Sequence, residues 1–281
     1  MPTRQLELSV GTIDCVDTGG AGPTLVLLHG LLMDASLWDG AVADLGRDHR
    51  CVVPTLPLGA HRHAVRDHAD LSLPGVARLV AELLEHLDLH DVTLVGNDTG
   101  GALVQLLAVG DHDRVGRIAL VSCDAFDNFP PGLSGRTLLR TGKLPPPLFG
   151  AFMLQLRLRP ARRLPLSFGW LTRRGDAATK GWLRPVLTQR AIRGDAVRML
   201  RAVAGDGPVL ADASDRLAGF DRPALVVWAT EDRVMPPAHG RRLAALLPRG
   251  RLVQVADSYT LVPLDQPVAL AAALREFVRT T

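Results

Sequence analysis

The feature that most constrains the fold is the segment 96–100, Gly-Asn-Asp-Thr-Gly, which joins a buried apolar run to a Leu- and Ala-rich helical pattern without a gap. A strand that turns directly into a helix brings backbone close on both sides, so small residues are needed two positions before and after the centre. The central residue takes a strained conformation. The pattern predicts that Asp98 is presented at the carboxyl end of a strand, on a helix N-terminus that favours its ionised form. The simpler interpretation is that Asp98 only caps the helix; the paired glycines favour a functional side chain.

Strand-like and helical patterns alternate over most of the 281 residues. The predicted strands are 5–10, 12–17, 24–28, 51–54, 91–96, 117–122, 224–229 and 251–256, the first two forming a hairpin about Gly11. The predicted helices are 34–45, 74–89, 101–109, 237–247 and 266–278. Such alternation implies right-handed crossovers. We therefore expect an α/β fold with a mostly parallel eight-stranded sheet and helices on both faces.

One segment differs from the rest of the chain in charge. Residues 128–205 hold 15 basic and two acidic residues, a net charge of +13, whereas the remainder carries −10. This contrast predicts that residues 126–206 form a separate, Arg-rich structural layer between the segments 1–125 and 207–281. Its apolar residues are Leu148, Phe149, Phe152, Met153, Leu154, Phe168, Trp170, Leu171, Trp182 and Leu183.

The Arg excess has three interpretations. With 30 Arg and 2 Lys in the chain, a solvated face of an Arg-rich protein is the simplest. A docking surface for an acidic partner or a carrier-bound substrate is the second, and contact with a membrane surface is the third. Nucleic acid is not expected, because the segment has few aromatic residues.

Other patterns narrow the class of protein. No apolar run approaches the roughly 20 residues of a transmembrane helix, and no secretory signal is apparent. Three widely spaced cysteines form neither a disulfide framework nor a zinc pattern. No phosphate-binding or dinucleotide-binding Gly motif occurs. We expect a cytoplasmic protein without metal or cofactor.

The order of motifs resembles the α/β-hydrolase fold superfamily over nearly the whole chain. The matching features are a strand followed by His29-Gly30, the turn at Asp98, the lid insertion, the segment 229–237 after a strand, and Asp265-Gln266-Pro267. An Asp at the turn resembles the branch of haloalkane dehalogenases and epoxide hydrolases. In that branch a carboxylate attacks carbon and water then cleaves the ester intermediate.

The resemblance implies a role for each matching position. Asp98 would be the nucleophile or general base, the backbone N–H groups of Leu31 and Thr99 would form an oxyanion hole, and Asp232 would be the acid. Asp124, after the strand 117–122, is the less favoured holder of the acid's role. Further residues expected at the pocket are His29, Asn97, Trp170, Tyr259, Thr260 and His61. The resemblance also implies that residues 126–206 are a helical, Arg-rich lid on a core domain of residues 1–125 and 207–281, and that apolar lid residues line a pocket over Asp98 for a small apolar molecule.

The chain departs from the family at the catalytic histidine. Counting back from Asp265, the position of that histidine holds Thr260, and residues 240–281 contain no His. His112 and His239 are expected at the surface. General acid–base catalysis is worth about 10²–10⁴-fold, so ester hydrolysis should be slowed.

Two narrower activities also match poorly. Dehalogenases of this branch hold the leaving halide with a Trp directly after the nucleophile and an Asn after the His-Gly motif. In this chain those positions are Thr99 and Leu31. The single tyrosine, Tyr259, lies outside the lid, where epoxide hydrolases have theirs. His61, His63 and His68 lie in a loop that borders the pocket in the family. They are a source of the missing base, a site for an anionic group, or part of a plain solvated loop.

Three functions are consistent with these residues. The first is hydrolysis of a small ester, halide or related bond at Asp98. The second is a non-hydrolytic lyase, isomerase or cyclase on the same fold, of the kind used in secondary metabolism, for which the loss of the histidine is no defect. The third is a ligand-binding protein without catalysis, in which Asp98→Ala would leave affinity and function intact.

Overall fold

The computed structural model describes residues 3–110 and 113–281, and across these residues eight strands form a single sheet. The strands are β1 (Thr3–Leu8), β2 (Gly11–Asp17), β3 (Thr24–Leu28), β4 (Arg50–Pro54), β5 (Val92–Asp98), β6 (Val115–Cys123), β7 (Ala224–Ala229) and β8 (Gly250–Val255). Their order is β1-β2-β4-β3-β5-β6-β7-β8, and only the pairs of β2 with β1 and β4 are antiparallel. The mostly parallel eight-stranded sheet predicted from the sequence is confirmed.

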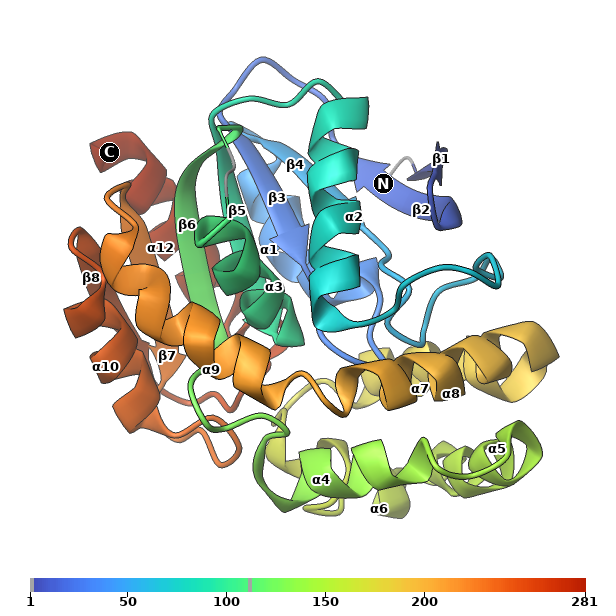
Figure 1. Cartoon of the computed structure of the whole chain (residues 1–281). Helices are drawn as coiled ribbons and strands as arrows, with labels where there is room; N and C mark the ends of the chain where they lie inside the picture. The colour runs from blue at the N-terminus through green and yellow to red at the C-terminus, as the bar shows by residue number, and fades with distance from the viewer. Residues whose placement is uncertain (1–2, 111–112) are drawn as a thin grey trace.

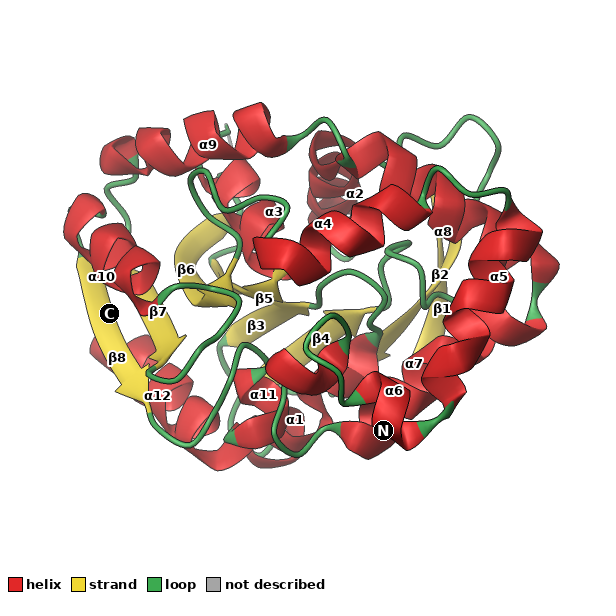
Figure 2. Ribbon diagram, turned by 90° about the horizontal axis from the view of Figure 1, so that it is seen from below, coloured by secondary structure: helices red, strands yellow, loops and turns green. Residues whose placement is uncertain are grey.

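Helices cover both faces of this sheet (Figure 2). One face carries α1 (Asp39–Leu45) and α12 (Pro267–Thr280), which pack against each other next to α11 (Val262–Asp265). The other face carries α2 (Leu73–His86), α3 (Thr99–Ala108), α9 (Gly207–Arg216) and α10 (Pro237–Leu246). Because both faces are covered, β5 and β7 are buried along their whole length, as expected for parallel strands made of continuous apolar runs.

Several boundaries differ from the sequence prediction; the helix predicted over 74–89, for example, ends at His86. The first hairpin turns at residues 9–10, and Gly11, at φ +112°, already begins β2. The expected helix 34–45 begins as a 3₁₀ turn, η1 (Ala35–Trp38), capped by the carboxylate of Asp34. Helix α3 starts at Thr99 rather than residue 101, because β5 runs through Asp98 and leaves no connecting residue.

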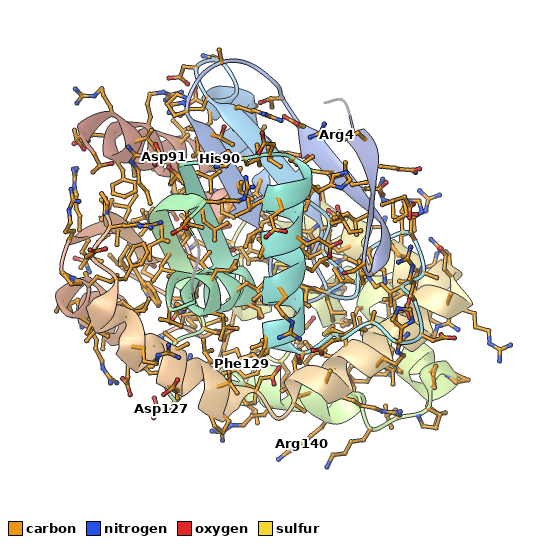
Figure 3. All side chains as sticks on the ribbon, turned by 45° about the horizontal axis from the view of Figure 1, so that its top comes forward. Arg4, His90, Asp91, Asp127, Phe129 and Arg140 are labelled. Atoms are coloured by element: carbon orange, nitrogen blue, oxygen red, sulfur yellow. The ribbon has the colours of Figure 1, made fainter. Side chains whose placement is uncertain are left out.

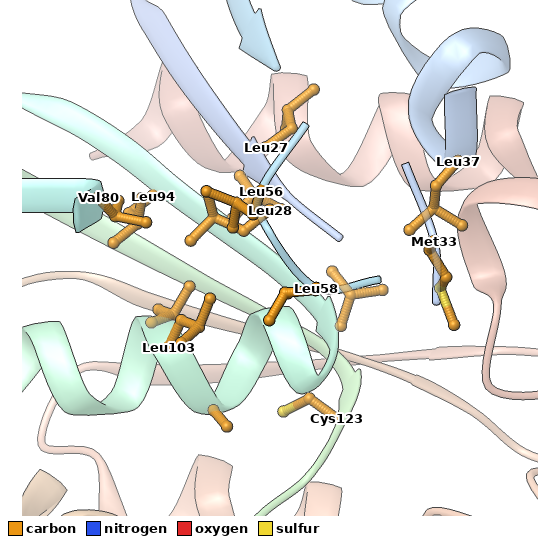
Figure 4. Packing of buried hydrophobic residues seen from close by; sticks show 14 of the residues in the cluster. Leu27, Leu28, Met33, Leu37, Leu56, Leu58, Val80, Leu94, Leu103 and Cys123 are labelled. Carbon is orange, nitrogen blue, oxygen red and sulfur yellow. The ribbon is translucent and has the colours of Figure 1, made fainter. Parts of the chain in front are cut away.

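The core is formed where β3 and β5 meet the helices of one face. Leu28 on β3, Leu94 on β5, Val80 on α2 and Leu103 on α3 converge, and all four are fully buried (Figure 4). Removing such side chains from water contributes about 1.5–3 kcal/mol each. This packing fixes the ends of β3 and β5, and therefore the two loops that carry the candidate site.

Between β6 and β7 the chain forms a helical segment; we call residues 126–206 the insertion. Its helices are α4 (Gly132–Thr141), α5 (Pro146–Leu154), α6 (Arg159–Arg162), α7 (Asp176–Thr188) and α8 (Arg190–Val203), with short 3₁₀ turns η2 (Gln155–Arg157) and η3 (Phe168–Trp170). Figure 1 shows them lying across the end of the sheet at which the parallel strands finish. A last 3₁₀ turn, η4 (Leu217–Gly219), follows α9. In the described ranges no helix has both the length and the apolarity required to cross a membrane.

Polar contacts hold the insertion on the rest of the chain. Thr172 donates from Oγ1 to Asp265 Oδ1 at 2.7 Å, and Trp182 donates from Nε1 to Ser36 Oγ at 2.8 Å. The Arg173 guanidinium pairs with Asp257. The insertion is thereby fixed to the loops after β3 and β8, on both sides of β5.

Candidate functional site

The turn from β5 into α3 has the strained geometry that the glycine pattern predicts. Asp98 adopts φ +55° and ψ −131°, a conformation that costs a non-glycine residue about 1–3 kcal/mol. A Cβ on Gly96 would lie 2.2 Å from the carbonyl oxygen of Gly100, and one on Gly100 would lie 2.3 Å from that of Leu28. A Cβ on Gly30 would lie 2.5 Å from Asp98 Oδ1. Glycine is therefore required at all three positions for steric reasons.

We expect Gly100→Ala to lower the free energy of unfolding by roughly 1–3 kcal/mol or more, because the added methyl group meets backbone that cannot move aside. Gly181→Ala is the matched control, since that glycine lies within α7 and a Cβ there has no neighbour within 4 Å. The control should stabilise by about 0.5–1 kcal/mol. Urea unfolding of both variants tests this, and equal stability of the two would contradict the steric account.

The two carboxylate oxygens of Asp98 have different surroundings. Oδ1 accepts the Thr99 backbone N–H at 2.6 Å and lies 2.9 Å from Thr99 Oγ1. Oδ2 has no hydrogen-bond partner among the described residues, and Asp98 lines a cavity. Burial raises the pKa of Asp98 to about 6, although the Thr99 hydrogen bonds oppose the rise. At neutral pH the group is thus a carboxylate with one fixed and one free oxygen.

A second carboxyl is linked to Asp98 through the hydroxyl of Thr99. Thr99 Oγ1 lies 2.9 Å from Asp98 Oδ1 and 2.9 Å from Asp124 Oδ2. A hydroxyl has one proton to donate, so two hydrogen bonds require that one of these carboxyls is protonated and donates to it. Asp124 is fully buried, and its Oδ1 has no partner among the described residues. Burial, with the nearby charges of Asp98 and Asp232, raises its pKa well above the usual range. Burial therefore favours the protonated form of Asp124.

The acid predicted after β7, Asp232, contacts Thr260, the residue at the position expected for a histidine. Thr260, fully buried, donates from Oγ1 to Asp232 Oδ1 at 2.8 Å. The same oxygen accepts the backbone N–H groups of Val234 and Met235 at 3.0 and 2.8 Å. Burial raises the pKa of Asp232 to about 6 against these bonds. The contact that would orient a histidine is thus made by a threonine, which has no basic group.

His29 and Asn97 are placed as structural residues. His29 Nε2 accepts the backbone N–H of Leu56 at 2.9 Å, so its Nδ1 carries the proton and donates to the Gly30 carbonyl at 2.9 Å. Burial lowers the pKa of His29 to about 4, so it is neutral and both nitrogens are occupied. Asn97 Nδ2 donates to the carbonyls of Val121 and Thr260, both at 2.8 Å, which ties the loop after β8 to β6.

The cavity above Asp98 has a volume of about 100 Å³ and is mainly apolar. It is lined by residues 31–33 after β3, by Asp98 and Thr99, by Val234, and by residues of the stretches 129–139, 152–156 and 166–171 of the insertion. The Leu31 N–H has no acceptor among the described residues, whereas the Thr99 N–H already binds Asp98. Three lining residues were not predicted from the sequence: Met33, Leu138 and Val234. Met33 and Val234 follow the family motifs at 29–30 and 229–232, and Leu138 lies on the amphipathic helix α4, so these positions could have indicated them.

Several residues expected at the pocket do not line it. Trp170 is 38% exposed on η3, because its chain turns outward there. Tyr259 lies between the guanidinium groups of Arg173 and Arg233, each 4.6 Å from its ring centre. Among the other lid residues, Leu148 and Leu154 are exposed, and Phe149, Trp182 and Leu183 pack in the core. Four of the ten, Phe152, Met153, Phe168 and Leu171, do line the cavity.

The histidines provide no base at the cavity within the described residues. His61 is buried, and its Nε2 lies 3.4 Å from Asp195 on α8. His63 pairs with Asp14 on β2. His239 is half-buried rather than at the surface, because its ring stacks edge-on against Phe126. His112 lies outside the described residues. Across those residues no three His, Cys, Asp or Glu side chains are placed to hold a metal ion.

Known proteins resemble this chain along its whole length. The family model described as alpha/beta hydrolase fold matches residues 23–267. Haloalkane dehalogenase 2 of Mycobacterium tuberculosis is 26% identical over 98% of this chain and 94% of its own. An uncharacterised protein of the same organism is 26% identical over 100% of this chain and 82% of its own. Among solved structures, an esterase from Thermogutta terrifontis (malate bound) aligns with a TM-score of 0.75 at 21% identity, covering 100% of this chain and 99% of its own.

Proposed function

Because this chain belongs to the alpha/beta hydrolase fold family, we propose that it is a hydrolase in which Asp98 attacks a carbon atom of a small apolar substrate. The observation that carries the proposal is the asymmetry of the Asp98 carboxylate. Its Oδ1 is fixed by the Thr99 N–H at 2.6 Å, and its Oδ2 is unpaired at an apolar cavity. The resemblance to a haloalkane dehalogenase supports a carboxylate nucleophile.

The proposed reaction has two steps. Oδ2 attacks carbon and displaces the leaving group, which gives an ester of Asp98 whose carbonyl oxygen is Oδ1. Water then adds to the ester carbonyl and the alcohol leaves. In the second step negative charge develops on Oδ1, beside the Thr99 N–H, and the free N–H of Leu31 is the candidate second donor. In this proposal the insertion is a lid that keeps bulk water from the apolar cavity.

The second candidate function is non-hydrolytic, with Asp98 as a general base. The observation that favours it is Thr260, which binds Asp232 where a histidine would be needed to activate water. A carboxylate whose pKa is about 6 suits proton abstraction near neutral pH. Both candidates use Asp98, and they differ in whether a covalent ester forms.

Turnover of activated esters, short haloalkanes and epoxides by the folded wild-type protein tests the hydrolase proposal. We expect hydrolysis of at least one class. The variant Asp67→Asn, which alters an exposed side chain remote from the cavity lining, should behave as the wild type. Absence of turnover across all three classes would contradict hydrolysis and favour the second candidate.

The activity should depend on pH through Asp98. Burial raises its pKa to about 6, and only the ionised form attacks, so kcat/KM should fall as the pH drops below about 6 and level off above it. The pKa of Asp232 is also about 6. The Asp232→Asn variant distinguishes the two carboxyls. Its kcat/KM should still fall below about pH 6, and loss of this fall would assign the titration to Asp232.

A further inference from the structure

We propose that the outer face of the insertion, residues 132–170, binds the surface of an anionic membrane, with its exposed leucines in the headgroup region and its arginines on the lipid phosphates. The route for substrate from the lipid into the cavity rests on the proposed function. The membrane contact itself does not.

Exposed apolar side chains are concentrated on this face. Of the ten large apolar residues that are exposed within the described residues, eight lie between positions 133 and 170. Six are leucines: Leu133, Leu148, Leu154, Leu158, Leu164 and Leu166. Single exposed leucines are ordinary, but a collection on one face marks an interaction surface.

Helix α5 is apolar on all sides. Its nine residues, Pro146–Leu154, include no charged side chain. Phe149 and Met153 are buried against the protein, while Leu148, Phe152 and Leu154 are exposed. A surface helix of a water-soluble protein normally presents polar residues outward. The outer side of α5 therefore suits an apolar environment.

The charge of the same face is of one sign. Residues 132–170 hold seven basic residues and no acidic residue, and of the seven only Arg162 is buried, where it pairs with Asp176. Arg136, Arg140 and Arg157 are exposed, and their side chains have no hydrogen-bond or ion-pair partner in the described part of the chain. Figure 3 shows Arg140 at the outer edge of this layer, with its side chain directed away from the sheet. Some exposed arginines elsewhere have acidic partners, as Arg251 has Glu276 at 2.8 Å, whereas Arg241 and Arg249 have none in the described part of the chain.

A lipid surface fits this combination better than a protein partner. The apolar residues are spread over α4, α5, the turn before α6 and the loop after it, and α4, α5 and α6 form the layer furthest from the sheet in Figure 1. A protein partner is usually anchored by a few residues in a central pocket, whereas headgroups and acyl chains adapt to scattered leucines and cations.

The cavity is bordered by this same face. Phe152 and Leu166 are both exposed and both line the cavity above Asp98. An apolar molecule dissolved in the membrane would reach Asp98 between these two side chains without crossing water. The surface and the cavity thus suit the same class of substrate, an apolar molecule that partitions into lipid.

Vesicle flotation with purified protein tests the membrane contact. The two probes are phosphatidylcholine vesicles and phosphatidylcholine vesicles that contain phosphatidylglycerol. The wild type should float with the anionic vesicles, and high salt should reduce the bound fraction. The double variant Leu154→Ser/Leu158→Ser should reduce partitioning onto anionic vesicles at least ~10-fold. Arg136→Gln/Arg140→Gln should reduce it about 10-fold and remove the preference for anionic lipid.

Matched controls lie on other surfaces. Val268→Ser alters an exposed apolar residue of α12, and Arg241→Gln/Arg249→Gln removes two exposed arginines outside the insertion. These variants should float as the wild type does.

Wild-type protein that stays unbound to both vesicle types would overturn the proposal, as would equal loss in the controls. A lipid-free dimer that Leu154→Ser/Leu158→Ser dissociates would also overturn it, in favour of a second copy of the chain. The Asp98→Asn variant should float normally, so this test and the test of the proposed function can fail separately.

Discussion

The Asp98→Asn variant should lose about 10³-fold or more of kcat/KM on any substrate that the wild type turns over. The amide keeps the size of the side chain and tolerates the positive φ of this position. It removes the negative charge and the free oxygen that attacks carbon, and loss of a covalent nucleophile is among the most damaging single changes in an enzyme. Steady-state kinetics beside the Asp67→Asn control measure the effect.

The same variant should be more stable than the wild type at pH 7. Burial raises the pKa of Asp98 to about 6 from an ordinary value of 3.8, so the ionised carboxylate disfavours the folded state at neutral pH. The asparagine should therefore raise the free energy of unfolding by on the order of 2 kcal/mol at pH 7. This gain in the free energy of unfolding is full above about pH 6. It disappears as the pH falls below about 4, where Asp98 of the wild type is protonated in both the folded and the unfolded state. Urea unfolding at pH 4 and pH 7 measures it.

These two results together separate chemistry from folding. An inactive variant that is more stable at pH 7 has lost a reactive group rather than its structure. An active Asp98→Asn variant would contradict both candidate functions, since each depends on the carboxylate. A variant that is inactive and less stable at pH 7 would contradict the buried, ionised state assigned to Asp98.

The Thr260→His variant should accelerate release of the product by about 10²–10⁴-fold if Asp98 forms an ester. Thr260 Oγ1 lies 2.8 Å from Asp232 Oδ1, so an imidazole at this position would have a carboxylate to orient it and stabilise its charge. Rapid-quench kinetics separate formation of the ester from its hydrolysis. The gain should appear in hydrolysis alone.

Thr260→Val is the control for this substitution. It keeps the branched shape, adds no base, and leaves Asp232 without one hydrogen bond, which should cost about 1–3 kcal/mol of stability. Because residue 260 is fully buried, the larger histidine must be accommodated by its neighbours, so the stability of both variants is measured first. No gain, or a loss, in native turnover by a folded Thr260→His variant would favour the non-hydrolytic function.

Much of the site follows from local sequence. The glycines around Asp98 predict the turn because each is required by backbone that is close in sequence or in the adjacent strand. Counting back from Asp265 assigns the position of the family's histidine to Thr260, and in the structure Thr260 contacts Asp232. Both predictions rest on short segments that directly follow strands. The strand order then determines which of these segments lie together at the carboxyl end of the sheet.

Contacts between distant segments could not be predicted. The Thr99 hydroxyl joins Asp98 to Asp124 at 2.9 Å, and this depends on the rotamers at the ends of two strands. His61 faces Asp195 of the insertion, 134 residues away, at 3.4 Å. Trp170 is exposed because the path of a 3₁₀ turn, not its apolar character, decides where it points. In each case residue type was informative, but the partner depended on tertiary packing.

The covalent ester of Asp98 is tested by the intact mass of the enzyme quenched during turnover of a haloalkane or epoxide. Because no histidine lines the cavity in the described part of the chain, ester hydrolysis is the slow step and the ester should accumulate. We expect protein that is heavier by the substrate-derived group, with the added mass on the peptide that contains Asp98 and absent from Asp98→Asn. Turnover with the enzyme at its unmodified mass throughout would contradict it.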